Sequence, residues 1–141
     1  MKITDTILLV EDDELDQKAV KRACKELKII NPLVITENGE EALAYLNKPD
    51  RIAPCLILLD LNMPRMNGME FLKKRQIDEK IKLMPVVVLT TSKEESDMIE
   101  SYKLGVQGYM EKPVDYKRFI EVMRAIHVYW ILSLTPHDDL L

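Results

Sequence analysis

Carboxylates stand at the ends of two strongly apolar segments of this chain. Ile7–Val10 runs into Glu11 and Asp12, and Leu56–Leu59 runs into Asp60. Three carboxylates brought to one place repel one another unless a cation lies among them. Oxygen ligands alone favour a hard ion such as Mg²⁺, which keeps several waters and takes only one or two carboxylates directly. The residue types therefore predict a Mg²⁺ site at these strand ends.

Each of these acids also has an ordinary explanation. Asp12 and Asp13 would stabilise the first turn of a helix in any protein, because the helix dipole favours negative charge there. Asp60 could bind a ribose hydroxyl, but the four glycines form neither a Gly-x-Gly-x-x-Gly nor a Gly-Lys-Thr phosphate loop. We therefore favour Asp60 as a nucleophile that accepts a phosphoryl group while Mg²⁺ orients the donor. A backbone carbonyl near Asn62 could add an oxygen ligand.

Two further apolar segments lead to groups that suit a phosphorylated product. Residues 86–89 lead to Thr90, which could offer a hydroxyl donor, and residues 108–110 lead toward Lys112, which could offer a compact positive charge. Taken singly, Thr90 is an ordinary strand threonine and Lys112 an ordinary surface lysine. Open parallel sheets place their chemistry at the carboxyl ends of the strands, so we expect both to point at Asp60.

The segments between the apolar runs have helical spacing. Apolar residues recur at three- and four-residue intervals from Leu15 to Leu27 after an acidic start. Further strands and helices are expected at residues 33–36, 39–46 and 69–77. Five β-α units in a row predict an α/β fold, a doubly wound five-stranded parallel sheet with helices on both faces.

The last two helices carry distinct start signals. Ser92 is expected to cap the fourth helix, with acids in its first turn and an apolar stripe on its inner side. Asp115 is expected to cap the last helix. The stripe of the fourth helix consists of Met98, Ile99 and Tyr102.

Composition bounds the class of protein. At 141 residues and 47% hydrophobic content, the chain can bury one core but not readily two. The net charge is -4 and basic residues are interspersed with acidic ones, so direct nucleic-acid binding is disfavoured. No apolar stretch approaches the ~20 residues of a membrane helix, and residues 1–5 do not resemble a secretory signal, so we expect a cytoplasmic protein without membrane association. Cys24 and Cys55 form no Cys-x-x-Cys pair and are expected to be buried or incidental thiols.

Four motifs together resemble the receiver domain of bacterial two-component response regulators. The resemblance extends from about Thr6 to Ile126, and the motifs occur in the order and approximate spacing of that family. They are Val10-Glu11-Asp12-Asp13, Leu59-Asp60-Leu61-Asn62-Met63-Pro64, Leu89-Thr90-Thr91 and Tyr109-Met110-Glu111-Lys112-Pro113.

The resemblance implies a (βα)5 flavodoxin-like receiver fold with strand order 2-1-3-4-5, phosphorylated by a sensor histidine kinase. It implies Asp60 as the phosphoacceptor and Thr90 and Lys112 as contacts of the phosphoryl group. It also places Tyr109 at the aromatic switch position, where the residue alone would indicate a half-buried core aromatic, and it suggests a cis bond before Pro113. The implied Mg²⁺ ligands are Glu11, Asp12, Asp60 and the backbone carbonyl of Asn62.

More specifically, the chain resembles stand-alone regulators that partner bacterial and cyanobacterial phytochrome kinases. This divides it into a receiver domain, residues 1–126 with its core from about residue 6, and a helix extension and tail, residues 127–141. We expect a signalling protein whose only chemistry is self-catalysed phosphotransfer and dephosphorylation. The alternative is a Mg²⁺-dependent phosphohydrolase of haloacid-dehalogenase type, but its motif needs a second Asp where this chain has Asn62. A flavodoxin-like cofactor protein lacks its phosphate loop here.

The last helix carries more apolar residues than one buried face needs, which predicts a homodimer through the fourth helix, the fifth strand and the last helix. In the alternative, Trp130 and its neighbours fold back onto their own domain. His127 and His137 are expected to be surface histidines. The residues expected to leave apolar surface are Tyr116, Ile120, Val128 and Ile131, with Tyr129 and Trp130 as a possible extension.

Overall fold

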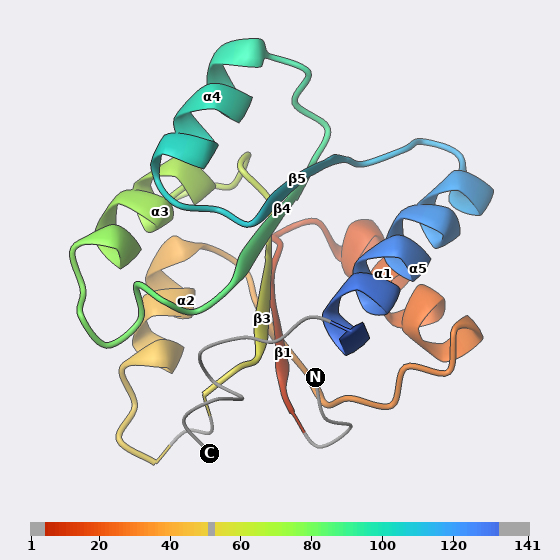
Figure 1. The fold of residues 1–141 in the computed structure, drawn as a ribbon, viewed down its shortest axis with the longest axis horizontal. Coiled ribbons are helices and arrows are strands. Elements are labelled where there is room, and N and C mark those ends of the chain that lie inside the picture. Colours follow the sequence, from red (N-terminus) through yellow and green to blue (C-terminus); the bar gives the residue numbers. More distant parts are fainter. Residues whose placement is uncertain (1–4, 51–52, 133–141) are drawn as a thin grey trace.

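The computed structural model describes residues 5–50 and 53–132, without the side chains of residues 131 and 132. Five parallel strands form one sheet in the order β2-β1-β3-β4-β5, which confirms the predicted fold (Figure 1). The strands are β1 Ile7–Val10, β2 Leu33–Thr36, β3 Leu56–Leu59, β4 Val86–Thr90 and β5 Gly108–Glu111, and the helices are α1 Glu14–Glu26, α2 Gly39–Leu46, α3 Gly68–Gln76, α4 Glu95–Lys103 and α5 Tyr116–Leu132.

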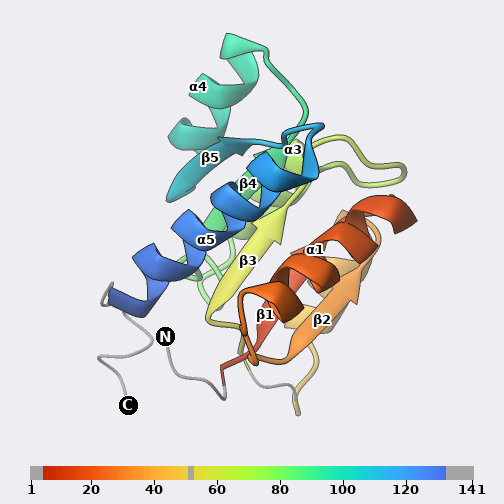
Figure 2. The same cartoon turned by 90° about the vertical axis from the view of Figure 1, so that its right-hand side faces the viewer.

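Helices cover both faces of the sheet. Helices α1 and α5 lie on one face, and α2, α3 and α4 lie on the other (Figures 1 and 2). Successive strand residues alternate between the two cores, so that Ile7 and Leu9 pack with α1 and α5 while Leu8 and Val10 pack toward α2 and α3. Strands β1, β3 and β4 are buried along their whole length and are continuous apolar runs, so their positions could be predicted closely from the sequence. Among the described residues, no helix is long and apolar enough to cross a membrane.

Helix α1 begins as its sequence indicates. The Asp13 carboxylate accepts hydrogen bonds from the backbone N–H groups of Leu15 and Asp16 at 2.8 and 3.2 Å. Val20 and Ala23 are buried against the sheet. Leu15, expected on the apolar face, is instead 75% exposed, because the first turn extends past the strand ends toward solvent.

Helix α4 differs from its prediction in both its cap and its buried face. Its N-cap is Glu94, while the Ser92 hydroxyl accepts a hydrogen bond from Glu94 N–H and donates one to Asp97. The predicted stripe faces outward, and Ser101 is the residue that α4 buries. The helix lies at the edge of the sheet over β5, where it finds little surface to cover. Met98, Ile99 and Tyr102 are 38%, 45% and 49% exposed.

Helix α5 runs without a break to Leu132, and Asp115 accepts a hydrogen bond from Lys117 N–H at its start. Trp130 is 4% exposed and lies in the same core as Phe119 and Met123, so it packs on its own domain as the alternative interpretation held. Ile120 is also buried, contrary to expectation, because it faces that core.

The other residues of the predicted apolar surface have mixed environments. Val128 and Tyr129 are exposed, and Tyr116 is half-buried. Cys55 is buried and Cys24 half-buried, and the two form no disulfide with each other. His127 is partly buried rather than at the open surface. The Ile131 side chain, His137 and the rest of the tail lie outside the described residues.

Candidate functional site

The carboxyl ends of β1 and β3 form the centre of the candidate site. The strand order reverses at this pair, which is where open α/β sheets form a crevice. Asp60 N–H donates to the Val10 carbonyl at 3.0 Å, which continues the ladder by one residue and sets Asp60 beside the end of β1. Oxygen atoms of Glu11, Asp12 and Asp60 lie within 4.8 Å of one another. The structure thus brings together the three acids that the sequence singled out.

Glu11 is the most perturbed of these acids. It is 2% exposed, and burial, together with the negative charge of Asp60, raises its pKa to about 7 against the opposing effect of Lys112. A cation placed beside such a carboxylate stabilises its charged form. The donor set consists only of carboxylate oxygens, which suits a hard divalent ion such as Mg²⁺. Glu11, Asp12 and Asp60 therefore fit the ion that the sequence predicts.

Lys112 reaches into the acidic cluster from the end of β5. Its ammonium donates to Glu11 Oε1 at 2.6 Å and to Asp16 Oδ2 at 2.9 Å, and it lies 3.7 Å from Asp60 Oδ2. Burial alone would lower the pKa of Lys112, but the hydrogen bond to Glu11 and the charges of Asp60 and Glu11 outweigh it, and the pKa is raised. Lys112 is therefore a fixed positive charge beside Asp60.

Thr90 and Tyr109 lie on the neighbouring strands. Thr90 is completely buried at the end of β4, and its backbone carbonyl accepts a hydrogen bond from Lys112 N–H at 2.6 Å. Its hydroxyl accepts one from Ser92 N–H at 3.3 Å. Tyr109 is half-buried, and its hydroxyl donates to the Ser92 carbonyl at 3.2 Å. Both residues therefore contact the loop that leads from β4 into α4.

Asn62 and Pro113 lie on the two loops next to Asp60 and Lys112. Asn62 N–H donates to Asp60 Oδ1 at 3.4 Å, so the loop turns back over the acceptor, and the role of the Asn62 carbonyl stays a prediction. The expected cis bond before Pro113 is wrong, because the described residues contain no cis peptide bond. The Lys112–Pro113 bond has the trans form, which X–Pro bonds favour by about 0.5–1 kcal/mol.

Gly68, the first residue of α3, packs directly on the backbone of Asp60. A Cβ atom at this position would overlap the Asp60 carbonyl oxygen and lie 2.7 Å from Leu61 Cα. Gly68 N–H also donates to the Leu61 carbonyl at 3.0 Å. Only glycine allows α3 to begin this close to the acceptor loop.

Sequence reasoning missed Asp16. This residue lies in the first turn of α1, four positions after Asp12, and its carboxylate holds Lys112. The helical spacing rule does not relate it to Asp12, because Asp12 precedes the helix. It was hidden because acids in a first helical turn have an ordinary explanation.

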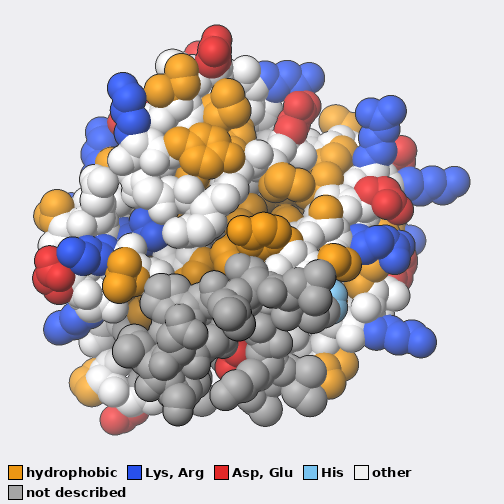
Figure 3. Space-filling view, in the orientation of Figure 1, with side chains coloured by type: hydrophobic (Ala, Val, Ile, Leu, Met, Phe, Trp, Pro, Cys, Tyr) orange, Lys and Arg blue, Asp and Glu red, His pale blue; other side chains and the backbone are white. Residues whose placement is uncertain are grey.

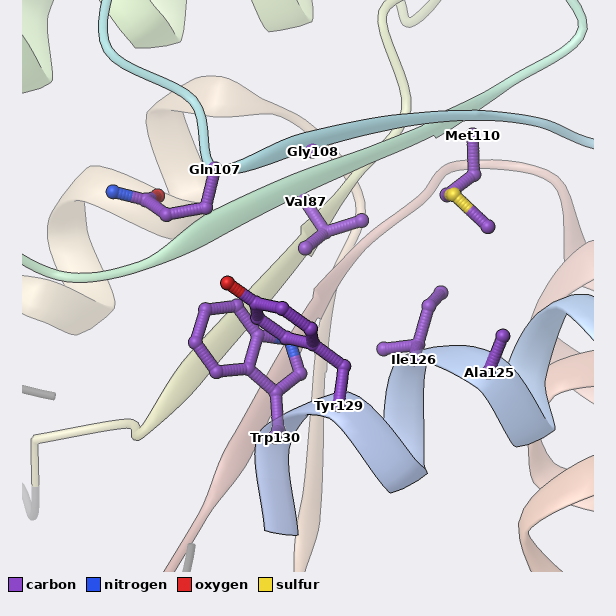
Figure 4. Close-up of a pocket in the computed structure, with 8 residues that line it drawn as sticks. All are labelled: Val87, Gln107, Gly108, Met110, Ala125, Ile126, Tyr129 and Trp130. Carbon is purple, nitrogen blue, oxygen red and sulfur yellow. The ribbon is translucent and has the colours of Figure 1, made fainter. Parts of the chain in front are cut away.

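An apolar cavity lies beside β5, between the sheet and α5. Its volume is about 250 Å³. Figure 4 shows the aromatic side chains of Tyr129 and Trp130 on α5 facing the strands, with Val87 and Met110 across the cavity. The lining carries no charged residue and is distant in sequence from the acidic cluster. The remaining lining residues are Gln107, Gly108, Ala125 and Ile126.

Comparison with known proteins gives a consistent result. The sequence matches the response regulator receiver domain family over residues 7–124. Response regulator Rcp1 of Synechocystis sp. is 38% identical over 133 residues, which cover 92% of this chain and 90% of that protein. The family assignment gives no support to the phosphohydrolase alternative.

Two similar solved structures extend the comparison. The phosphorylated cyanobacterial phytochrome response regulator RcpA aligns with a TM-score of 0.88 at 33% identity, over 94% of this chain and 99% of that chain. The Mn²⁺-bound form of response regulator Rcp1 aligns with a TM-score of 0.85 at 37% identity, over 93% and 97%. With its strand order, its acidic cluster and its lysine at the end of β5, the chain belongs to the response regulator receiver family.

Proposed function

We propose that the chain accepts a phosphoryl group on Asp60 from a sensor histidine kinase and thereby switches a protein-interaction surface. The observation that carries this proposal is the Asp60 carboxylate, which lies among Glu11 and Asp12 with the Lys112 ammonium 3.7 Å away. Mg²⁺ held by these three acids and the Asn62 carbonyl would orient the donor and neutralise its oxygens. The Mn²⁺ named for the Rcp1 structure supports a divalent ion at such a site.

In this transfer an oxygen of Asp60 forms a bond to phosphorus as the bond from phosphorus to the donor atom breaks. The donor is a kinase histidine nitrogen, or an acyl oxygen when a small molecule such as acetyl phosphate is used. A carboxylate needs no separate base, since it carries no proton to remove. Lys112 and the Thr90 hydroxyl then provide charge-assisted hydrogen bonds to the product.

The kinase is proposed to be of the phytochrome type. Receiver domains are phosphorylated by histidine kinases, and the similar RcpA structure is described as a phytochrome response regulator. The protein would act in the cytoplasm, as a signalling protein whose only chemistry is its own phosphorylation and dephosphorylation.

The proposed switch runs through Thr90 and Tyr109. Contacts of the phosphoryl group with Thr90 and Lys112 contribute about 1.5–3 kcal/mol each, or about 3–6 kcal/mol together. Reversing a two-state equilibrium takes about 5.5 kcal/mol, so phosphorylation supplies most of that and a partner the rest. Ser92 N–H donates a hydrogen bond to the Thr90 hydroxyl, and the Ser92 carbonyl accepts one from the Tyr109 hydroxyl. A change at Thr90 would therefore alter both the contact of Tyr109 and the loop that leads into α4.

A second copy of the chain is the proposed partner of the α4-β5-α5 surface. We define this surface by the exposed residues Met98, Ile99 and Tyr102 on α4 and Val128 and Tyr129 on α5. Figure 3 shows apolar side chains gathered over α4 and continuing toward β5. The apolar cavity beside Tyr129 extends the surface at one end. A closed two-fold pair is the simplest way for one protein species to cover such a patch.

Phosphorylation itself tests the proposed function. Acetyl phosphate and Mg²⁺ should add one phosphoryl group, detected by intact mass, and Asp60→Asn should abolish it while the exposed Asp50→Asn leaves it unchanged. A chelator should suppress the reaction in the wild-type chain. Labelling that survives Asp60→Asn would locate the acceptor elsewhere. Phosphorylation that continues at the same rate in the chelator would show that the reaction needs no metal ion.

A further inference from the structure

The partners of the Lys112 ammonium carry this inference. Its two hydrogen bonds go to Glu11 Oε1 at 2.6 Å and Asp16 Oδ2 at 2.9 Å, whereas Asp60 Oδ2 is more distant at 3.7 Å. The Lys112 side chain is 7% exposed, so few water molecules can replace these partners. The ammonium is therefore held on the α1 side of the site and not on the proposed acceptor.

Asp16 differs from the other two carboxylates around Lys112. It lies on α1, outside the group of acids that can share a metal ion, and its side chain is 38% exposed. Its backbone is fixed, because Asp16 N–H donates to the Asp13 N-cap carboxylate at 3.2 Å. A cation bound by Glu11 would weaken the hold of Glu11 on Lys112, since the two positive charges then share one carboxylate. The same cation would leave the ion pair between Asp16 and Lys112 in place, because Asp16 is not one of its ligands.

A phosphoryl group on Asp60 would add roughly 1.5–2 negative charges and three acceptor oxygens beside Lys112. Lys112 has to give up or share a present partner to contact those oxygens. We propose that Asp16 is a positioning residue that acts through Lys112, retaining the ammonium in the unphosphorylated arrangement and so limiting the accumulation of the phosphorylated form. This inference rests on the proposed function.

The competing explanation is that Asp16 only stabilises the first turn of α1. Glu14 lies in the same turn, is exposed, and pairs with Lys18 at 3.7 Å. A neutral residue at position 14 removes the same charge from the same helix end without touching Lys112. Glu14→Gln is therefore the matched control.

The test compares the ratio of phosphorylated to unmodified protein by intact mass, at fixed acetyl phosphate and saturating Mg²⁺. Asp16→Asn should raise the ratio about threefold or more, in line with the loss of one partly exposed ion pair that favours the unphosphorylated form. Asp16→Glu should restore much of the wild-type value, and Glu14→Gln should leave the ratio unchanged.

A second measurement shows whether Asp16 acts through Lys112. In the unphosphorylated protein, Asp16→Asn should raise the unfolding equilibrium constant about threefold in the wild-type background, because it removes the ion pair with Lys112. In a Lys112→Met background the same substitution should have no larger effect than Glu14→Gln, which removes first-turn charge alone. This double-mutant cycle uses unphosphorylated protein throughout, so it does not depend on whether the Lys112→Met variant can be phosphorylated.

The outcomes separate this inference from the proposed function. A ratio that Asp16→Asn leaves unchanged or lowers, or that Glu14→Gln raises equally, overturns the role of Asp16 while Asp60 phosphorylation stands. An effect larger than that of Glu14→Gln that persists without Lys112 overturns action through that residue. A wild-type chain that takes up no phosphoryl group overturns the proposed function, and the inference with it.

Discussion

At the scale of single residues, Glu11 links the protonation of the site to the stability of the domain. The carboxylate is buried between Asp60 and Lys112, and its pKa is raised to about 7 from an ordinary value of 4.5. Between these two values the folded protein holds a proton that the unfolded chain releases. Glu11 therefore stabilises the folded state at low pH, and this contribution is lost as the pH rises through about 7.

The resulting prediction concerns the metal-free protein. Its free energy of unfolding should be about 1–3 kcal/mol higher at pH 5.5 than at pH 8 from Glu11 alone. The measurement is urea unfolding of the wild-type chain and of Glu11→Gln, both in chelator and at both pH values. Subtracting the two pH profiles removes the contribution of other titrating groups, such as His127, whose pKa is lowered by burial. Saturating Mg²⁺ should flatten the wild-type curve, since metal binding requires the charged carboxylate. Equal pH profiles for the two chains would contradict the prediction.

Most residues of the candidate site could be predicted because each follows an apolar strand. Strand ends are the best defined points of a parallel sheet in sequence, and the topology brings them to one edge. Asp16 could not be found in this way, because its contact with Lys112 depends on how α1 is rotated against the sheet. The trans bond before Pro113 could not be predicted either, since both isomers differ by little free energy.

At the scale of elements, the buried Arg75 ties α3 to the end of α4. Arg75 is 2% exposed, and its guanidinium donates to the carbonyls of Met84, Leu104 and Gly105 at 2.8–3.4 Å. Of the described carboxylates, none lies within salt-bridge distance of it. Leu104 is the C-cap of α4, where helix carbonyls carry partial negative charge. One buried cation thus satisfies three backbone carbonyls from two segments, the turn before β4 and the end of α4.

Arg75→Met should lower the free energy of unfolding by about 2–4 kcal/mol, because it leaves these buried carbonyls without a donor. Lys73→Met is the control, since Lys73 also connects α3 to α4 through Glu100 but at 3.5 Å and with both side chains exposed. We expect that change to stay within about 0.5 kcal/mol. Urea unfolding of both variants decides the matter, and similar losses would show that Arg75 has no special role.

The helices show the limits of prediction at this scale. Spacing alone identified an apolar side on α4, yet Met98, Ile99 and Tyr102 face solvent. A periodic pattern shows that one side of a helix is apolar but not which surface will cover it. Arg75 was equally hidden, because it follows Lys73 and Lys74 in a run that looks like a solvated helix end.

At the scale of the whole molecule, the exposed α4-β5-α5 surface predicts self-association. Ile99→Asp should lower the association constant about tenfold or more in sedimentation, because it places a charge within the apolar contact. Ile77→Asp is the matched control, since Ile77 is 80% exposed on the α3 end, outside this surface. A point substitution is cleaner than removing residues 127–141, which would take Trp130 out of the core. An equal effect of both variants, or a wild-type mass independent of concentration, would contradict the prediction.

Trp130 gives the molecule a built-in optical probe. It is the only tryptophan in the chain, it is 4% exposed, and it borders the apolar cavity with its ring 5.0 Å from that of Tyr129. Its emission should therefore be that of a shielded indole, poorly reached by dissolved quenchers. Trp130 lines the cavity near the end of α5, whereas the acidic cluster lies at the carboxyl ends of β1 and β3, so a shift in the tryptophan spectrum signals that the cavity has been filled or opened. A ligand or partner that fills this cavity can therefore be detected from the fluorescence of the protein itself.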